Sequence, residues 1–126
     1  MKTLNREQKV RLFNKTMGGY DMFDETEIVK RRVALMEEEW GELKEALYLY
    51  LLGETSREHV LKEMCDVQYI LSGTADALGF TDVFEPAFNR VHDNNMTKFK
   101  EGVKFNGQGK VVKPMEFEEV QLGDLV

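Results

Sequence analysis

Apolar residues recur every three or four positions through four successive segments of the chain, which is the spacing of amphipathic α-helices. The first segment, residues 4–17, stops at a pair of glycines, and the second runs from about residue 25 to Gly53. The third segment stops at Gly79 and the fourth follows within a few residues. Glycine tolerates the left-handed backbone that ends many helices, so these glycines predict helix ends. Helices joined by such short turns predict an all-α fold, an antiparallel four-helix bundle.

The sequence also predicts where two of these helices begin and which side chains fill the core. Thr55 and Glu58 have the spacing of a capping box, which would open the third helix. Pro86 fits the first turn of the fourth helix, where backbone amides have no helical partner. The apolar stripe of the second and third segments supplies the predicted core: Met36, Trp40, Leu43, Leu47, Tyr50, Val60, Met64, Val67, Leu71, Ala75 and Leu78.

The character of the chain changes after Lys98. Residues 102–114, GVKFNGQGKVVKP, place Asn-Gly and other glycines between short β-prone runs, which predicts a short hairpin or an ordered tail. The helical part is therefore expected over about residues 4–99 and the tail over residues 100–126. A length of 126 residues suits one domain, so a single domain over residues 1–126 is predicted. A chain of this size often completes its core by forming a homo-oligomer.

The net charge of the chain limits its partners. A formal charge of -6 argues against a protein that holds nucleic acid polymers by their phosphates. Cys65 is the single cysteine, so no intramolecular disulfide is possible, and no apolar run approaches the roughly 20 residues of a membrane span. A cytoplasmic protein without a membrane partner is expected. If its ligand is an anion, a cation must be recruited to bind it.

Carboxylates interrupt the apolar stripe of two helices at matching spacing. In the stretch MEEEWGELKEAL, residues 36–47, Glu39 has Glu42 and several apolar residues as helical neighbours, so it borders the core. Glu63 and Asp66 repeat this arrangement on the third helix. A buried carboxylate without a partner is unfavourable, and such groups normally become neutral, pair with a cation or bind metal. The pattern therefore indicates a cation between the two helices.

Two carboxylate pairs on neighbouring helices offer oxygen ligands only, which is the set that suits Mg²⁺ or Mn²⁺. Lys44 and Lys62 are close in sequence, but their helical phase predicts that they point elsewhere and are poor counterions. The plain alternative is that these carboxylates are surface charges of amphipathic helices. A nonenzymatic helical adaptor or oligomerisation protein would then show the same pattern without binding metal.

The acidic residues also resemble a known family signature. The run EEWGE, residues 38–42, is followed after 20 residues by EMCD, residues 63–66. This order is similar to the EExxE...ExxD signature of the MazG-like superfamily of all-α nucleoside triphosphate pyrophosphohydrolases, which includes dimeric dUTPases and phosphoribosyl-ATP pyrophosphohydrolases. The similarity continues through VHDNNMTKF, residues 91–99, and covers roughly residues 8–114.

The resemblance implies a function and a role for each carboxylate. It implies Mg²⁺-dependent hydrolysis of a nucleoside triphosphate, expected to be a dNTP, between the α and β phosphates to the monophosphate and pyrophosphate. Mn²⁺ is expected to substitute for Mg²⁺, and the protein is expected to form a homodimer or homotetramer. Glu38 would orient or deprotonate the attacking water. The implied metal ligands are Glu39, Glu42, Glu63 and Asp66.

Three further residues are candidate substrate contacts. Asn95 and Lys98 continue the stripe of the fourth helix, where Lys98 can meet a phosphate and Asn95 can hydrogen-bond phosphate, ribose or base. Tyr69 lies three residues after Asp66 and can stack on the sugar or the base. Each also has an ordinary structural explanation, because lysine is favoured at helix C-termini and aromatic residues are frequent at dimer interfaces.

Overall fold

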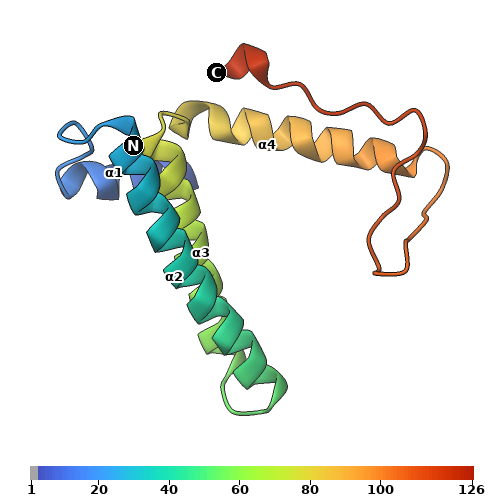
Figure 1. Ribbon diagram of the computed structural model, residues 1–126, viewed down its shortest axis with the longest axis horizontal. Helices are drawn as coiled ribbons and strands as arrows, with labels where there is room; N and C mark the ends of the chain where they lie inside the picture. The colour runs from blue at the N-terminus through green and yellow to red at the C-terminus, as the bar shows by residue number, and fades with distance from the viewer. Residues whose placement is uncertain (1–2) are drawn as a thin grey trace. The chain divides into compact units, whose positions relative to one another are not determined.

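The computed structural model describes residues 3–126 and contains four α-helices (Figure 1): α1 (Arg6–Thr16), α2 (Glu25–Leu51), α3 (Arg57–Ala77) and α4 (Thr81–Met96). Two short 3₁₀ helices follow, η1 (Thr97–Phe99) and η2 (Gly123–Leu125). The contacts of the chain group into two compact units, one ending at Asp82 and one spanning Val83–Val126. The predicted all-α class is confirmed. No helix in residues 3–126 combines the length and the apolar character that a membrane crossing needs.

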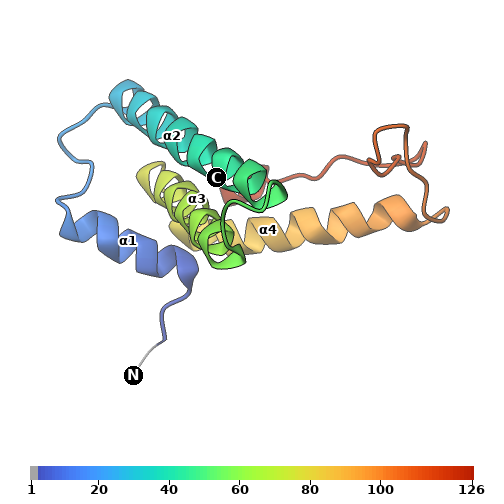
Figure 2. The same ribbon diagram turned by 90° about the horizontal axis from the view of Figure 1, so that it is seen from below.

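Helix packing in the first unit centres on α3. Figures 1 and 2 show α2 and α3 side by side as an antiparallel pair joined by a short turn, and α1 packs against α3. This arrangement of helices is the expected helical bundle packing. The buried apolar side chains come from all three helices: Val10, Ile28, Leu43, Ala46, Val60 and Ala75.

The buried core is smaller than the apolar stripe predicted. Leu43 and Val60 are buried as expected. Trp40, Met64 and Leu71 are instead exposed, at 50%, 47% and 42% of their surface. A helix in contact with one neighbour buries only the face turned toward it, and the stripe on α2 and α3 is wider than that face. Apolar surface therefore remains uncovered on both helices.

The start of α3 differs from the prediction by one residue. Ser56, and not Thr55, is the N-cap, because its side-chain oxygen accepts a hydrogen bond from the backbone N–H of His59 at 3.1 Å. The Thr55 hydroxyl oxygen lies 2.7 Å from Nδ1 of the His59 ring. Serine and threonine are both good caps, so two adjacent hydroxyl residues cannot be separated by their type alone.

The position of Pro86 in α4 also differs from the prediction. The helix begins at Thr81, so the proline is its sixth residue and lies beyond the first turn. The Thr81 hydroxyl donates to Oδ1 of Asp76 at 2.9 Å, which ties the start of α4 to the end of α3. Proline has no N–H, so α4 lacks one interior hydrogen bond at this point.

The second unit contains the predicted short hairpin. Phe105 and Val111 form an isolated antiparallel bridge across a turn rich in glycine. Within the same unit, the guanidinium of Arg90 makes two hydrogen bonds to the carboxylate of Asp124, at 2.6 and 2.8 Å. This contact fastens the C-terminal end of the chain to α4.

One glycine inside α2 and one just after its end are expected to respond to alanine in opposite ways. Gly53 ends the helix with φ of +74°, so Gly53→Ala should lower the free energy of unfolding by about 1 kcal/mol. Gly41 has helical backbone and open space around it, so Gly41→Ala should raise that energy by about 0.5–1 kcal/mol. Urea unfolding followed by circular dichroism measures both. Changes of the same sign would contradict this assignment of the helix end.

Candidate metal centre

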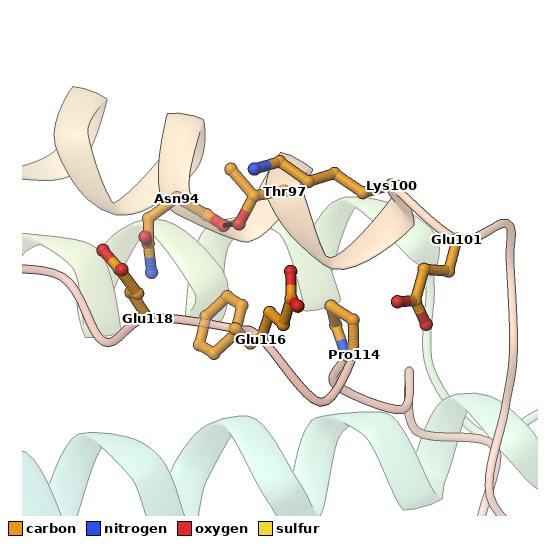
Figure 3. A pocket seen from close by; sticks show the side chains of 8 residues that line it. Asn94, Thr97, Lys100, Glu101, Pro114, Glu116 and Glu118 are labelled. Carbon is orange, nitrogen blue, oxygen red and sulfur yellow. Dashed lines mark hydrogen bonds between the residues drawn. The ribbon is translucent and has the colours of Figure 1, made fainter.

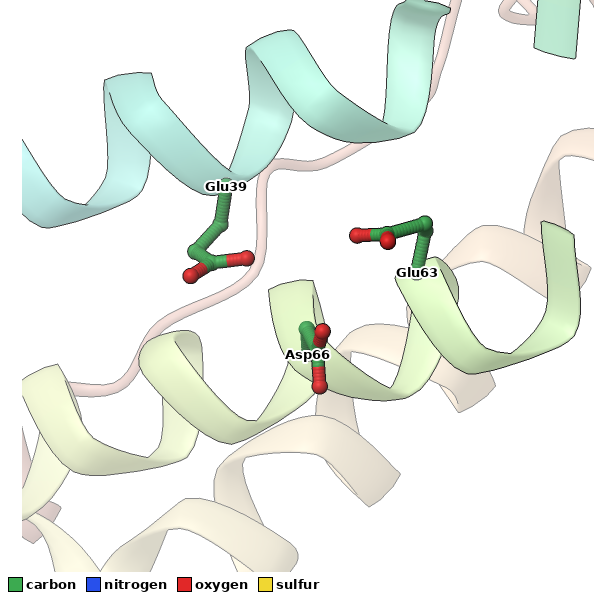
Figure 4. Close-up of side chains that lie close together, drawn as sticks. All are labelled: Glu39, Glu63 and Asp66. Carbon is green, nitrogen blue, oxygen red and sulfur yellow. The ribbon is translucent and has the colours of Figure 1, made fainter. Parts of the chain in front are cut away.

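Three carboxylates meet between α2 and α3 (Figure 4). Glu39 comes from α2, and Glu63 and Asp66 come from α3, with one oxygen of each within 4.8 Å of the others. Residues three apart share a helix face, so Glu63 and Asp66 both reach the side of α3 that α2 covers. Three of the four predicted ligands therefore form one cluster.

Two oxygens of this cluster are buried without a hydrogen-bond partner among residues 3–126. They are Oε2 of Glu39 and Oε2 of Glu63, and Glu63 as a whole is 7% exposed. A buried carboxylate oxygen without a donor is unfavourable unless the group is protonated or bound to a cation. A set of ligands made only of oxygen fits Mg²⁺ or Mn²⁺. The residues present therefore suit the predicted cofactor.

The charges around Glu39 act on its proton affinity. Burial raises the pKa of Glu39 above its ordinary value, and four negative neighbours raise it further, in the order Glu42, Asp66, Glu38 and Glu63. Glu38 and Glu42 are exposed and lie outside the three-carboxylate cluster, although both are close enough to influence Glu39. The site concentrates negative charge, which a dication would relieve.

The prediction that Lys62 points away from the carboxylates is wrong. Its Nζ lies 2.6 Å from Oδ2 of Asp66 and 3.8 Å from Oε1 of Glu63. Lysine four residues before an aspartate lies on the same helix face, and the hydrogen bond to Asp66 raises the pKa of Lys62. The lysine side chain is 64% exposed, so water screens the pair and its contribution to stability is small.

His59 is a neighbour of the cluster and was not among the site residues predicted from the sequence. Its Nε2 lies 3.4 Å from Oε1 of Glu63, on the preceding turn of α3. The spacing of four residues between His59 and Glu63 carried this information, in the same way as the spacing between Lys62 and Asp66. Both side chains border the carboxylates from the α3 side.

Tyr69, a predicted substrate contact, packs against α1. Its ring meets the ring of Phe13 edge to face, with centroids 5.3 Å apart, and 40% of Tyr69 is exposed. Such aromatic pairs stabilise helix contacts. Tyr69 therefore helps to pack α3 against α1, and its contact with substrate stays a prediction.

Asn95 and Lys98, the other predicted substrate contacts, belong to the second unit. Asn95 is exposed near the end of α4, and Lys98 lies in η1 and not in the α-helix itself. The Lys98 ammonium lies 5.6 Å from the centroid of the Phe117 ring, where the ring face attracts a cation. The contact of either residue with phosphate stays a prediction.

A cavity of about 600 Å³ lies in the second unit, between the end of α4 and the tail (Figure 3). Its charged lining consists of Lys100 and three glutamates, Glu101, Glu116 and Glu118. An excess of carboxylates without metal repels phosphate, and the lining includes none of the predicted site residues. This cavity is therefore not the candidate site.

A second cavity, of about 470 Å³, lies in the first unit and has a different chemistry. Its lining combines aromatic rings with two arginines: Met17, Gly19, Tyr20, Phe23, Arg31, Arg32, Ala34 and Leu35. The guanidinium of Arg31 lies 4.2 Å from the centroid of the Phe23 ring. Leu35 is one helical turn before Glu39, so this cavity begins close to the carboxylate cluster along α2.

The fold and the cluster together define an all-α protein with a candidate dication site between two antiparallel helices. Residues 12–95 match the phosphoribosyl-ATP pyrophosphohydrolase family, and the chain belongs to this family. The family is part of the MazG-like superfamily, so the resemblance seen in the sequence is confirmed. Its members are pyrophosphohydrolases of nucleotide-like substrates. No curated protein gives a significant match to the chain.

The charge crowding predicts that Glu39→Gln stabilises the metal-free protein. The substitution removes one negative charge from a group of five, and a gain of roughly 0.5–1 kcal/mol at neutral pH is expected. The folded-state pKa of Glu39 is raised, so the folded protein binds more protons than the unfolded one between the two pKa values. The contribution of Glu39 to the free energy of unfolding is therefore most favourable below the ordinary pKa of glutamate. It is lost as the pH rises through the raised pKa of the folded state.

The advantage of Glu39→Gln should accordingly grow with rising pH and vanish under acid conditions. Thermal unfolding in a chelator across this range measures it. The matched control is Glu45→Gln, which changes an exposed glutamate of the same helix. Equal behaviour of the two variants would show that Glu39 is not under charge strain.

Proposed function

We propose that the protein hydrolyses a nucleoside triphosphate, and a deoxynucleoside triphosphate in particular, between the α and β phosphates in a Mg²⁺-dependent reaction. The products would be the nucleoside monophosphate and pyrophosphate. The observation that carries this proposal is the cluster of half-buried Glu39, buried Glu63 and half-buried Asp66 in a chain of a pyrophosphohydrolase family.

Glu39, Glu63 and Asp66 would hold Mg²⁺ through their clustered oxygens, and Glu42 would join them from the next turn of α2. Mn²⁺ would occupy the same oxygen ligands, because the two ions share this preference. Mg²⁺ usually retains several waters, so four carboxylates need not fill its coordination sphere. When bound, the ion would neutralise phosphate charge and make the attacking water more acidic.

Glu38 would orient or deprotonate the attacking water. Adjacent residues of a helix point about 100° apart, so Glu38 does not share the direction of Glu39 toward α3. The side chain is exposed and lies outside the three-carboxylate cluster, but it is near enough to act on the charge of Glu39. A carboxylate beside the metal ligands, and not among them, is suited to accept a proton.

Substrate would be held by groups outside the carboxylate cluster. We propose that Lys98 and Asn95 bind the phosphates or the nucleoside and that Tyr69 contacts the sugar or base. The exposed part of Tyr69 is consistent with this role. The cavity bordered by Phe23 and Arg31 offers an aromatic and cationic surface that suits a base and its phosphates.

The protein would work as a homodimer or homotetramer. Apolar side chains remain exposed on the outer faces of α2 and α3, including Trp40, Leu47 and Leu61. A groove of about 360 Å³ between these helices is lined largely by apolar atoms of Leu47, Val60 and Met64 and their neighbours. Large exposed apolar patches mark interaction surfaces, and a second copy of the chain would cover this one.

A nonenzymatic helical adaptor is the alternative. The same exposed apolar faces would receive partner helices, and this function would need no metal. This alternative does not account for Oε2 of Glu39 and Oε2 of Glu63, which are buried without a hydrogen-bond partner in the described part of the chain. Stoichiometric binding of Mg²⁺ or Mn²⁺ separates the two functions.

Product analysis tests which bond is broken. The protein should be incubated with a panel of ribo- and deoxynucleoside triphosphates and Mg²⁺, and the phosphorus products resolved by ³¹P NMR. Pyrophosphate and a nucleoside monophosphate are expected, because the chain belongs to a pyrophosphohydrolase family and a bound dication would activate the attacking water. A parallel reaction in chelator is the control. Orthophosphate with a nucleoside diphosphate as the first products would refute the proposal.

Amide substitutions test the roles of two adjacent glutamates. Glu39→Gln should lower Mn²⁺ affinity and turnover together, because it removes a charged ligand. Glu38→Gln should retain Mn²⁺ binding while kcat falls by roughly 10²- to 10⁴-fold, the usual effect of losing a general base. Calorimetric titration with Mn²⁺ and turnover assays measure the two quantities. If Glu38→Gln loses metal as completely as Glu39→Gln, Glu38 is a ligand and its assigned role is wrong.

A further inference from the structure

Arg32 crosses the interface between α2 and α3 as a buried cation. It is 4% exposed, and no carboxylate of residues 3–126 lies within ion-pair distance of it. Its Nη2 donates to the carbonyl of Ile70 at 2.9 Å and its Nε to the hydroxyl of Thr74 at 3.1 Å, both on α3. Nη1 donates to the hydroxyl of Tyr20 at 2.7 Å. Burying a charge among neutral acceptors is unfavourable, so its presence here requires a reason.

Gly73 provides the space that the guanidinium occupies. A Cβ at this position would lie 2.5 Å from Nη2 of Arg32 and 3.6 Å from the Asn14 amide nitrogen of α1. Glycine inside a helix costs about 1 kcal/mol relative to alanine. Gly73 therefore lowers the intrinsic stability of α3 at the point where Arg32 lies against its backbone.

The spacing of this contact matches the spacing of the carboxylates. Arg32 is seven residues before Glu39 on α2, and Thr74 is eight residues after Asp66 on α3. On each helix this is two turns, or about 10–12 Å. Because the helices are antiparallel, the arginine contact and the carboxylate cluster are two neighbouring levels of one interface. Fixing the register at one level fixes it at the other.

We propose that Arg32, lying against Gly73, sets the register of α2 on α3 and so holds Glu39 within reach of Glu63 and Asp66 for dication binding. Arg32 is then a positioning residue, since it acts on the metal through the helices. The inference rests on the proposed function in one respect, because the site that it positions is the proposed Mg²⁺ site. A guanidinium suits this task, because its planar fork donates in several fixed directions at once.

Charge and position predict opposite effects of removing this arginine. A nearby cation repels a dication, so loss of the charge alone would strengthen metal binding. Loss of the register would let the carboxylates move apart and would weaken it. The sign of the change in Mn²⁺ affinity therefore distinguishes an effect of the arginine charge from an effect of the helix register.

The first experiment compares Arg32→Met with Lys30→Met by calorimetric titration with Mn²⁺ and no nucleotide. Lys30 is an exposed cation of the same helix, so its replacement removes the same charge without touching the interface. Arg32→Met should weaken Mn²⁺ binding by about tenfold or more, the usual effect of losing a group that orients metal ligands. Lys30→Met should bind Mn²⁺ as the wild type does. Circular dichroism of each variant checks that the helices are intact.

The second experiment displaces the arginine without removing it. Gly73→Ala should make the guanidinium swing away from Ile70, and it should weaken Mn²⁺ binding as Arg32→Met does. In the double variant, Gly73→Ala should add nothing, because the side chain that it displaces is gone. If Arg32→Met does not fold, Gly73→Ala alone carries the test.

Three outcomes would overturn the inference. Folded Arg32→Met and Gly73→Ala variants that bind Mn²⁺ as tightly as the wild type would show a role limited to stability, even with a lower unfolding temperature. Tighter binding in Arg32→Met would show that only its charge matters. A wild-type protein that binds no Mn²⁺ would refute the proposed metal site together with this inference, whereas the first two outcomes leave the proposed function standing.

Discussion

The interface of α2 and α3 has to hold carboxylates together that repel one another. Oε2 of Glu39 and Oε2 of Glu63 are buried there without a hydrogen-bond donor among residues 3–126, and one oxygen of Asp66 lies within 4.8 Å of an oxygen of each residue. On either side of this cluster the interface uses ordinary means of attachment. Leu43 and Val60 pack toward the turn, and the hydrogen bonds of Arg32 lie toward the other end. The favourable contacts on both sides of the cluster offset the repulsion between its carboxylates. Functional sites commonly depart from the best local stability in this way.

The sequence was a good guide wherever the signal was local. The glycine ends of α2 and α3 were predicted correctly, because Gly53 and Gly79 both adopt positive φ. Three of the four predicted ligands, Glu39, Glu63 and Asp66, lie together, although the rule that residues three and four apart share a face predicts only the pairs within one helix. Lys62 was wrongly predicted to point away from the carboxylates, although the same rule applies to it, because Lys62 and Asp66 are four residues apart and pair on one helix face at 2.6 Å.

The features that the sequence did not reveal depend on contacts between distant segments. Nothing around Arg32 in the sequence distinguishes it from Arg31, yet one is buried against α3 and the other lies over an aromatic ring. The exposure of Trp40 and Leu71 has the same origin. A pattern of apolar residues predicts which face of a helix is apolar, but it does not predict how much of that face another helix buries. Thr55 and Ser56 are adjacent hydroxyl residues, and it is Ser56 whose side chain accepts the backbone hydrogen bond at the start of α3.

The contact between Arg32 and Gly73 also restricts the order in which this chain can change over evolutionary time. A side chain at position 73 conflicts with the guanidinium, while loss of the arginine removes the conflict. If Arg32 is substituted first, position 73 can then accept a residue that favours the helix more than glycine does. If Gly73 is substituted first, the intermediate protein contains a buried arginine charge displaced from its hydrogen-bond acceptors. Relatives are expected to vary at these two positions together, so that arginine at the first accompanies glycine at the second.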